Sequence, residues 1–376
     1  MRKNPVTTSY PIRPAVLDFA PYSPGLSIDE IRRRFNLESV VKMASNENPL
    51  GTSPLVKEAV CRAATSAFRY AQSGNPRLAE ALAAHHNVPA ACIVTGNGSD
   101  EVIDLLIRVC PTPGRHNVVM AEPSFSIYRL QSKLCGVEMR RVPLREDFSF
   151  DFEKMLASVD ADTALVFLTT PDNPSGHCPT GKDVAAFARA LPAGCLLVMD
   201  EAYMDFADDE AARSLLPRRE EFPNLVVLRT FSKSFGMAGL RLGYGIMPEP
   251  LAAALCRVRL PFSVNILAEE AGLAALKDET FRRATLECVR SGREFLSRGL
   301  AALGCRVWPS MANFLMFALP SGCRHTPRSL FEALLAKGMI IRPLASYGLD
   351  AHLRVSIGTA AENKLFLELL RTEFAV

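Results

Sequence analysis

The chain has 376 residues, of which 48% are hydrophobic, and a formal net charge of +3 at pH 7. This length predicts two domains, or one large domain with a smaller one attached. The small net charge argues against a nucleic-acid partner, and the lack of a long, charge-free apolar stretch argues against a membrane span.

The pattern of cysteines and histidines indicates whether disulfides or metal sites are expected, and the N-terminal sequence indicates the cellular compartment. The ten cysteines are scattered and never form CxxC, which favours reduced thiols over disulfides or a zinc site. None of the six histidines belongs to an HExxH motif, so no metal site is expected. The N-terminal sequence MRKNPVTTSYPIRP lacks the apolar core of a signal peptide. The expected compartment is therefore the cytoplasm.

Five prolines within the first 25 residues predict an extended N-terminal arm. A short helix is expected after it, near residues 28–35. The basic run Arg32-Arg33-Arg34 follows Asp29 and Glu30 in this helix. We interpret it as a solvated helix face rather than a nucleic-acid patch.

From about residue 91, short apolar runs rich in β-branched residues alternate with helical patterns. The alternation predicts an α/β fold with a mostly parallel central sheet and helices on both faces. The predicted strands are residues 92–95, 117–121, 137–142, 163–169, 195–200, 224–230 and 244–247. The predicted helices are residues 99–110, 125–135, 181–190 and 249–258.

The pattern changes after about residue 265. One or two long helices are expected over residues 265–303. Short strands follow at 306–308, 314–318, 339–342 and 353–357, and a closing helix at 362–372. We therefore predict an arm and helix over residues 1–40 that join the small domain or a dimer interface, a large domain over 41–262, and a small α+β domain over 263–376.

Polar, glycine-rich and aromatic segments follow the predicted strands of the large domain. Ligands of open α/β sheets bind outside the carboxyl ends of the strands, so these segments are expected to lie together at one edge. They are GNGSDE (residues 96–101), EPSFSIY (122–128), TTPDNPSG (169–176), DEAY (200–203) and TFSKSFG (230–236).

Each segment has an ordinary structural interpretation beside a functional one. Ser99 or Asp100 can simply cap a helix, although free N–H groups at a helix N-terminus also bind phosphate. Asp200 ends the apolar run LLVMD and needs a partner, which is either a buried arginine or a cationic ligand atom. Asn173 lies in a proline-rich turn, where structural asparagines are common.

Lys233 and Arg241 lie in RTFSKSFGMAGLRLG, directly after an apolar run. Most lysines are exposed, but burial beside cations lowers a lysine pKa and makes the neutral amine available. The planar fork of Arg241 suits phosphate. A lysine, an acid, polar donors, a phosphate cradle and a flat side chain at one edge match the requirements of pyridoxal phosphate (PLP).

The chain resembles a known family at these residues. NENPLG (46–51), GNGSDE, DNPSG (172–176), DEAY, RTFSKSFGMAGLRLG, ANF (312–314) and HLRVSIGT (352–359) recur in this order in the fold-type I, PLP-dependent aminotransferases of class I/II. The similarity runs from about residue 21 to the C-terminus. Within the family, the chain most resembles the branch that acts on histidinol phosphate.

This resemblance implies roles for individual residues. Lys233 would form the Schiff base with PLP and carry the proton of the reaction, and Asp200 would pair with the pyridine nitrogen. Asn173 and Tyr203 would donate to the ring oxygen, and Phe125 would lie against the ring. The residues implied around the phosphate are Ser99, Asp100, Thr230, Ser232 and Arg241.

Further residues are implied at the substrate and at a subunit interface. Arg354 would hold an α-carboxylate, and Tyr22, Asn313 and Arg342 would lie near the distal or phosphate end of the substrate. Tyr70 would cross to the phosphate of a neighbouring subunit in a homodimer. The family usually has RYP here, whereas this chain has RYA, so the local turn can differ.

The expected partners are a small-molecule amino donor and a 2-oxo acid, with histidinol phosphate and 2-oxoglutarate ranked first. An aromatic amino acid as the amino donor is an alternative. A PLP lyase or decarboxylase that acts on a phosphorylated amino acid is another. A ligand-binding relative without catalysis is ranked last, because Lys233, Asp200 and Arg354 are all present.

Overall fold

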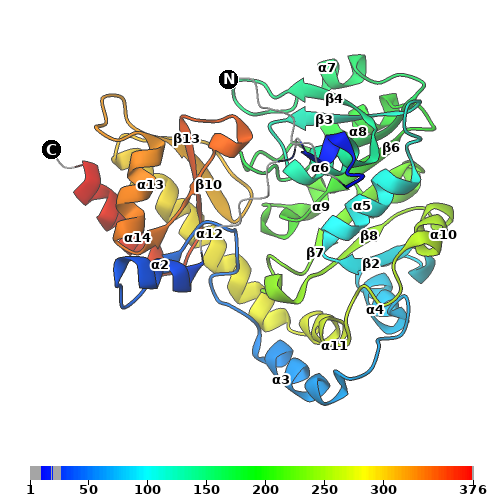
Figure 1. The fold of residues 1–376 in the computed structure, drawn as a ribbon, viewed down its shortest axis with the longest axis horizontal. Helices are drawn as coiled ribbons and strands as arrows, with labels where there is room; N and C mark the ends of the chain where they lie inside the picture. The colour runs from blue at the N-terminus through cyan, green and yellow to red at the C-terminus, as the bar shows by residue number, and fades with distance from the viewer. Residues whose placement is uncertain (1–9, 18, 20–26, 375–376) are drawn as a thin grey trace.

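The structure is a computed structural model, and it describes residues 10–17, 19 and 27–374. A seven-stranded sheet forms the centre of the larger part (Figure 1). Its order is β2-β8-β7-β6-β5-β3-β4, and β8 is antiparallel to both of its neighbours. The other neighbouring pairs are parallel, which confirms the predicted α/β fold with a mostly parallel sheet.

The strand bounds agree with the apolar runs to within two residues. They are β2 Ile93–Asn97, β3 Asn117–Glu122, β4 Glu138–Pro143, β5 Thr163–Thr169, β6 Leu196–Asp200, β7 Leu225–Thr230 and β8 Leu242–Ile246. Alternate side chains of one strand enter different cores, because successive residues point to opposite faces. Val166 and Leu168 of β5 pack on one face of the sheet, and Leu165 and Phe167 pack on the other.

Helices cover both faces of this sheet. The helices of the larger part are α3 Pro54–Ala63, α4 Pro76–His86, α5 Ser99–Val109, α6 Ser126–Cys135, α7 Phe152–Ala157, α8 Gly181–Ala190, α9 Glu210–Arg213, α10 Glu249–Val258 and α11 Ile266–Ala275. Helices α8 and α10 have the predicted bounds. The prediction did not include α3, α4, α7 or α9. It also described the first 25 residues as an extended arm, whereas the described part of that arm forms helix α1 (Pro14–Leu17), which contacts α6.

The smaller part is built around the 24-residue helix α12 (Glu279–Ala302), which runs between the two parts in Figure 1. The region predicted as one or two helices is two, because Asp278 caps a new helix by accepting from the Phe281 N–H. The other elements are α13 Pro327–Ala336, α14 Ala360–Phe374, β9 Arg306–Val307, β10 Phe314–Ala318, β12 Arg342–Pro343 and β13 His352–Ser356, with sheet order β12-β13-β10-β9.

The single strand predicted over residues 339–342 was wrong. The chain forms two short strands there, β11 (Met339–Ile340) and β12, which belong to different sheets. Strand β11 pairs in parallel with β1 (Val41–Lys42), from the far end of the chain. No local pattern predicts such a long-range partner.

Helix α2 (Ile28–Phe35) has the predicted bounds and packs on the smaller part, where Ile31 shares a core with Leu335 and Ile340. Helix α11 packs against α3 and α4. The domain bounds 1–40, 41–262 and 263–376 stay a prediction. None of the described helices combines the length and apolar character that crossing a membrane requires.

Candidate active site

The carboxyl edge of the large sheet gathers most of the predicted residues. Asp200 and Thr230 end neighbouring parallel strands, and Asn173 follows β5 on the next strand over. Helix α5 starts at Ser99, just after β2. Lys233 follows β7 in a tight turn. The sheet order therefore places these segments side by side, as parallel topology requires.

Lys233 is partly buried in front of this edge. Its Nζ donates to the Ser45 carbonyl oxygen at 3.2 Å and lies 5.6 Å from the centre of the Tyr203 ring. Burial, and then the charge of Arg354, lowers the pKa of Lys233 to about 8. A substantial fraction of the amine is therefore neutral near physiological pH.

Asp200 is 3% exposed at the end of β6. Its Oδ2 accepts from the Tyr128 hydroxyl at 2.6 Å, and its Oδ1 accepts from the Ala202 N–H at 3.2 Å. Burial raises the pKa of Asp200 to about 6. Tyr128, which also contacts the Thr169 hydroxyl, was missed from the sequence, although its place in EPSFSIY was the available signal.

Asn173 and Arg354 form a buried pair across the two parts of the molecule. The Arg354 Nη1 donates to the Asn173 Oδ1, and Nη2 donates to the Ala44 carbonyl at 3.0 Å. A guanidinium only donates, so the Asn173 amide nitrogen faces away from it and is left for another acceptor. The buried Nε of Arg354 has no partner among the described residues.

Tyr203 and Asn313 both contact Asn46. The Asn46 Nδ2 donates to the Tyr203 hydroxyl oxygen at 3.1 Å, and the Asn313 Nδ2 donates to the Asn46 carbonyl at 3.0 Å. The Oδ1 of Asn313 is buried without a partner within the described chain. Burial raises the pKa of Tyr203, so its hydroxyl keeps its proton at neutral pH.

The start of α5 forms a cradle with the turn after Lys233. The Arg241 Nη2 donates to Asp100 Oδ2 at 3.2 Å, and Nη1 lies 3.5 Å from the Ser232 Oγ. A Cβ at Gly98 would lie 2.5 Å from the Arg241 Nη2, and one at Gly243 would lie 2.2 Å from the Ser99 nitrogen. Both close approaches in this cradle therefore require glycine.

The remaining sheet-edge residues lie beside this cradle. The Thr230 hydroxyl accepts from the Ser232 N–H at 3.1 Å, which fixes the entry to the Lys233 turn. Phe125 is partly buried at the start of α6, with its ring edge-on to Tyr128 at 5.7 Å. Burial raises the pKa of Asp100, while Arg241 opposes that shift.

Arg342 and Tyr70 are not part of this hydrogen-bonded cluster. Arg342 is partly buried on β12, directly opposite Arg354 on β13. Tyr70 is 81% exposed and stacks on Phe262, with ring centroids 4.6 Å apart. Tyr22 lies outside the described residues.

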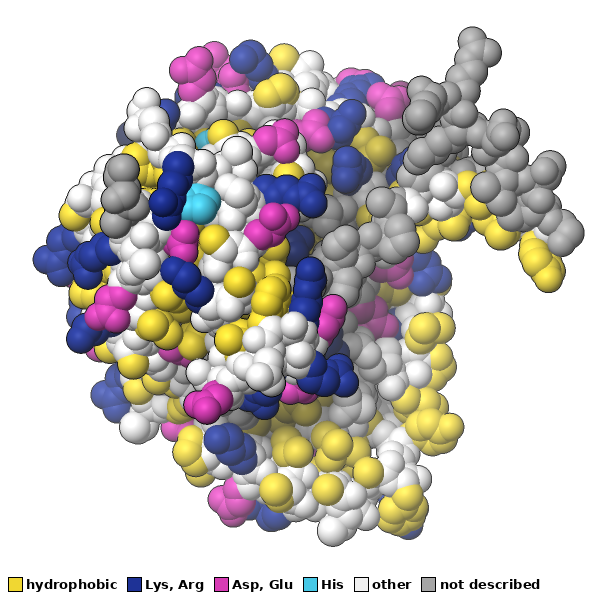
Figure 2. Space-filling model, turned by 60° about the vertical axis from the view of Figure 1, so that its left-hand side comes forward, with side chains coloured by type: hydrophobic (Ala, Val, Ile, Leu, Met, Phe, Trp, Pro, Cys, Tyr) yellow, Lys and Arg dark blue, Asp and Glu magenta, His cyan; other side chains and the backbone are white. Residues whose placement is uncertain are grey.

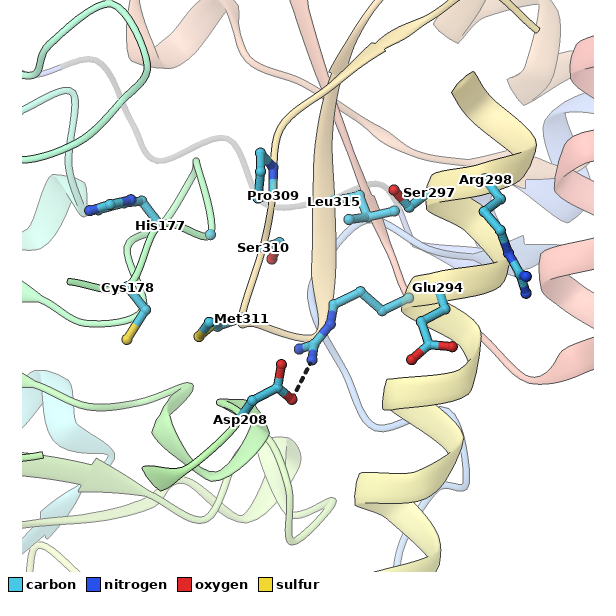
Figure 3. A pocket seen from close by; sticks show the side chains of 12 residues that line it. His177, Cys178, Asp208, Glu294, Ser297, Arg298, Pro309, Ser310, Met311 and Leu315 are labelled. Carbon is cyan, nitrogen blue, oxygen red and sulfur yellow. Dashed lines mark hydrogen bonds and ion pairs between the residues drawn. The ribbon is translucent and has the colours of Figure 1, made fainter. Parts of the chain in front are cut away.

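Two cavities are lined by other residues than the sheet-edge cluster, apart from Thr230, which also lines the second. One, of about 520 Å³, opens between the segment after Asn173 and α12, where Arg293 pairs with Asp208 at 3.2 Å (Figure 3). Both Arg293 Nη atoms are already hydrogen bonded, one of them to two carbonyl groups. The Arg293 guanidinium is therefore already engaged by the protein.

The second cavity, of about 220 Å³, lies behind the Lys233 turn. We call its ion-paired lining the charged cluster; its members are Glu201, Asp205, Glu210, Arg229 and Arg282. Arg229 lies 2.5 Å from Glu201, 2.9 Å from Glu210 and 3.4 Å from Asp205. Asp205 also accepts from the Ser234 hydroxyl, next to Lys233. Sequence reasoning missed this cluster.

Comparisons with known proteins agree with this geometry. The family model for aminotransferase class I and II matches residues 38–370. A histidinol-phosphate aminotransferase of Nitratidesulfovibrio vulgaris (strain Hildenborough) is 63% identical over 95% of both chains, and one of Oleidesulfovibrio alaskensis is 61% identical over 96% of this chain and 95% of its own.

A solved structure extends this likeness to three dimensions. The histidinol-phosphate aminotransferase from Sinorhizobium meliloti, in complex with pyridoxal-5'-phosphate, matches with a TM-score of 0.85 and 28% identity. The match covers 97% of this chain and 99% of that one. The family match spans most of the chain and includes the turn that presents Lys233. The chain therefore belongs to the class I and II aminotransferase family.

Proposed function

We propose that this chain is a PLP-dependent histidinol-phosphate aminotransferase, which moves an amino group between L-histidinol phosphate and 2-oxoglutarate. Three relatives of this name are 61–63% identical over at least 95% of the chain. The observation that carries the substrate assignment is the pair of arginines on neighbouring strands, Arg342 and Arg354.

The residues at the sheet edge fit PLP, which supplies an electron sink when bound. Lys233 is the attachment point, and Asp200 lies at the end of the adjacent strand β6, suited to the pyridine nitrogen. The cradle of Gly98, Ser99 and Arg241 suits the phosphate because it combines a helix N-terminus with a guanidinium.

Two residues are free to donate to the ring oxygen. Asn173 uses its Oδ1 for Arg354, so its Nδ2 remains a donor. Tyr203 accepts from Asn46 and keeps its own proton. Phe125 supplies the flat side chain for the ring. Lys233, with its pKa lowered to about 8, takes the substrate's α-proton and returns it.

Arg342 and Arg354 make an anion site. Residues directly opposite on antiparallel strands project from the same face, and like charges there are destabilising. The Arg342 side chain forms no hydrogen bond or ion pair with another described residue. A phosphate dianion fits between two such cations, whereas a single α-carboxylate needs only Arg354. An aromatic amino acid therefore leaves Arg342 unused, which ranks that alternative second.

A panel of amino donors with 2-oxoglutarate tests the substrate. We expect the wild type to prefer histidinol phosphate over phenylalanine in kcat/KM. Arg342→Ala should lower kcat/KM for histidinol phosphate roughly ten- to a hundredfold, the value of one charged hydrogen bond, and change that for phenylalanine much less. Arg328→Ala, at a guanidinium 88% exposed on α13, is the control. Preference for phenylalanine in the wild type would refute the substrate assignment.

The same experiment separates a transaminase from other PLP enzymes on this fold. A transaminase exchanges the amino group between glutamate and 2-oxoglutarate without net release of ammonia or carbon dioxide. A lyase or decarboxylase acting on a phosphorylated amino acid releases one of them. Glutamate turnover with no such release is the expected result.

The proposal includes a cytoplasmic homodimer whose active sites are shared. Figure 2 shows apolar side chains over the lower part of the molecule, where α3 lies. Exposed large apolar residues in this region of the chain include Leu55, Phe68, Tyr70, Leu260 and Phe262. Exposed aromatic residues in such number are typical of an interface. Tyr70 contacts Phe262 rather than its own sheet-edge cluster, which supports a role across that interface.

Mixing two inactive variants tests the sharing. Lys233→Ala and Tyr70→Ala homodimers should each be weak. In a heterodimer, one site carries both changes and the other carries neither, so about half of the wild-type activity per dimer should return. Heterodimers of verified composition that recover no activity would place Tyr70 within its own subunit.

A further inference from the structure

Residues 44–46 connect several site residues that are far apart in the chain. This segment leads into NENPLG, a motif to which the proposed function gives no role. Three of its carbonyl groups accept from site residues: Ala44 from Arg354, Ser45 from Lys233 and Asn46 from Asn313. The side chain of Asn46 adds the contact with Tyr203.

The hydrogen bonds of Ser356 fix the orientation of the Asn46 amide. The backbone N–H of Asn46 lies 2.8 Å from the Ser356 Oγ. A backbone N–H only donates, so this oxygen accepts and its proton is free to donate elsewhere. The side-chain oxygen of Asn46 lies 3.0 Å from the same Oγ and receives that proton. The amide NH₂ group must therefore face the other way.

That NH₂ group faces Tyr203. The distance from the Asn46 Nδ2 to the Tyr203 Oη is 3.1 Å, and because the NH₂ group donates, the Oη accepts. The described residues offer the Tyr203 proton no acceptor. It must therefore point away from Asn46. Tyr203 is 5% exposed, and the Lys233 Nζ lies over its ring, so the hydroxyl belongs to the sheet-edge cluster.

We propose that Asn46 is a positioning residue for the transamination: it occupies the acceptor side of the Tyr203 hydroxyl and so directs the Tyr203 proton to the ring oxygen of bound PLP. This inference rests on the proposed function. Asn46 is suited to the task because it is 1% exposed and held on three sides. Its backbone has a φ of 56°, which asparagine tolerates better than most residues.

The donor has a measurable effect on the nitrogen that links Lys233 to the coenzyme. A hydrogen bond to the ring oxygen draws negative charge from it, which weakens its hold on the proton of that nitrogen. Losing the donor therefore raises the pH at which the nitrogen loses its proton. Asn46→Asp keeps the size, the backbone preference and the Ser356 contact. It replaces the NH₂ group with an oxygen that accepts the Tyr203 proton.

The test is a pH titration of the bound coenzyme's absorbance in the full-length holoenzyme. We expect Asn46→Asp to raise the midpoint by about one pH unit, a tenfold change in the proton equilibrium. Asn87→Asp is the matched control, because Asn87 is exposed and has a φ of 53° at the C-terminus of α4. Its midpoint should equal that of the wild type.

A second background separates the hydrogen bond from the new charge. In Tyr203→Phe, which lacks the hydroxyl, the shift caused by Asn46→Asp should fall to less than half. An equal shift with and without the hydroxyl would overturn the inference, as would a wild-type midpoint in Asn46→Asp. If wild-type protein showed no PLP absorbance, the proposed function would fail first.

Ser356→Ala gives an independent test if Asn46→Asp does not fold. It removes the group that fixes the amide and leaves residue 46 unchanged. The amide can then turn its oxygen toward Tyr203, so we expect a smaller midpoint shift in the same direction. An unchanged midpoint in Ser356→Ala would contradict the proposed chain of hydrogen bonds.

Discussion

Two groups of buried and partly buried polar residues lie around the Lys233 turn, and they differ in how their charges are balanced. On one side lie Asp200, Lys233 and Arg354, none of which forms an ion pair with another described residue. On the other side lies the charged cluster, where Arg229 contacts three carboxylates. Burial of charged residues alone therefore does not indicate an active site. Burial of charged residues without an oppositely charged partner does.

The directions of the pKa shifts express the same contrast. The pKa of Lys233 is lowered and that of Asp200 is raised, so burial disfavours both charges. In the charged cluster, burial works against the charges, but the pKa of Arg229 is raised by its carboxylates and that of Asp205 is lowered by Arg229 and Arg282. Glu201 is an exception, because its complete burial raises its pKa despite Arg229.

Unpartnered atoms occur in both groups. The Nε atoms of Arg229 and Arg282 are as unsatisfied as that of Arg354. The difference lies in the remaining atoms of each side chain, which in the charged cluster reach carboxylates and in the site reach neutral oxygens. The charged cluster is expected to stabilise the fold, and the site is expected to cost stability until its ligand binds.

The largest effect is expected at Lys233. Lys233→Arg keeps the positive charge but cannot form the exchangeable bond to PLP. Transamination should fall by more than about a thousandfold, because attachment and proton transfer are both lost. Steady-state rates and the coenzyme absorbance measure this. Lys182→Arg, at an exposed lysine on α8, should leave both unchanged. Substantial turnover by Lys233→Arg would show that the group around Lys233 is not the catalytic site.

A large loss of stability is expected in the charged cluster. Arg229→Met leaves Glu201 buried without its cation, which typically costs about 3–5 kcal/mol. Denaturant unfolding of the apo-protein at pH 7.5 measures this. Arg328→Met, in an exposed pair with Glu332, should change stability by less than about 1 kcal/mol. Equal losses of unfolding free energy in the two variants would show that the charged cluster does not stabilise the fold.

A smaller effect of opposite sign is expected at Asp200. Its folded pKa is about 6, above the ordinary value of 3.8, so the folded state binds more protons between these values. Wild-type apo-protein therefore loses stability from this group as pH rises from below 4 to above 6. Asp200→Asn avoids that loss and should be more stable above pH 6 by up to ~3 kcal/mol, and equally stable below pH 4.

Unfolding of apo-protein at several pH values checks this prediction, with Asp350→Asn, at an exposed position, as the control. The same Asp200→Asn variant should lose most of its transamination, because Asp200 is the acid partner that we propose for the ring nitrogen. If the variant were less stable than the wild type at pH 7.5, the Asp200 carboxylate would stabilise the fold, as the charged cluster is expected to do.

The strands of the large sheet and the site residues that follow them could be predicted from the sequence alone. Residues 163–169 are apolar and β-branched, and β5 has those bounds. The glycines of RTFSKSFGMAGLRLG indicated a turn. Its lysine follows an apolar strand directly, which an ordinary surface lysine does not require, so the turn was predicted to belong to a functional site. The site residues at strand ends followed from parallel topology.

Contacts that join distant segments could not be predicted. Asn46 and Tyr203 are 157 residues apart, and nothing local pairs them. Arg229 was predicted to lie in a strand and begins the Lys233 motif, but its ion pairs could not be predicted, because its carboxylate partners come from other elements. Strand β12 exists through its pairing with β13. The position of Arg342 directly opposite Arg354 therefore could not be predicted without the three-dimensional structure.

The most direct test of the account is to locate the lysine that holds PLP. Borohydride reduction of the wild-type holoenzyme fixes the coenzyme to its lysine, and peptide mass spectrometry identifies the labelled residue. We expect a single label per chain, on Lys233. A label on any other lysine, with Lys233 unmodified, would contradict it.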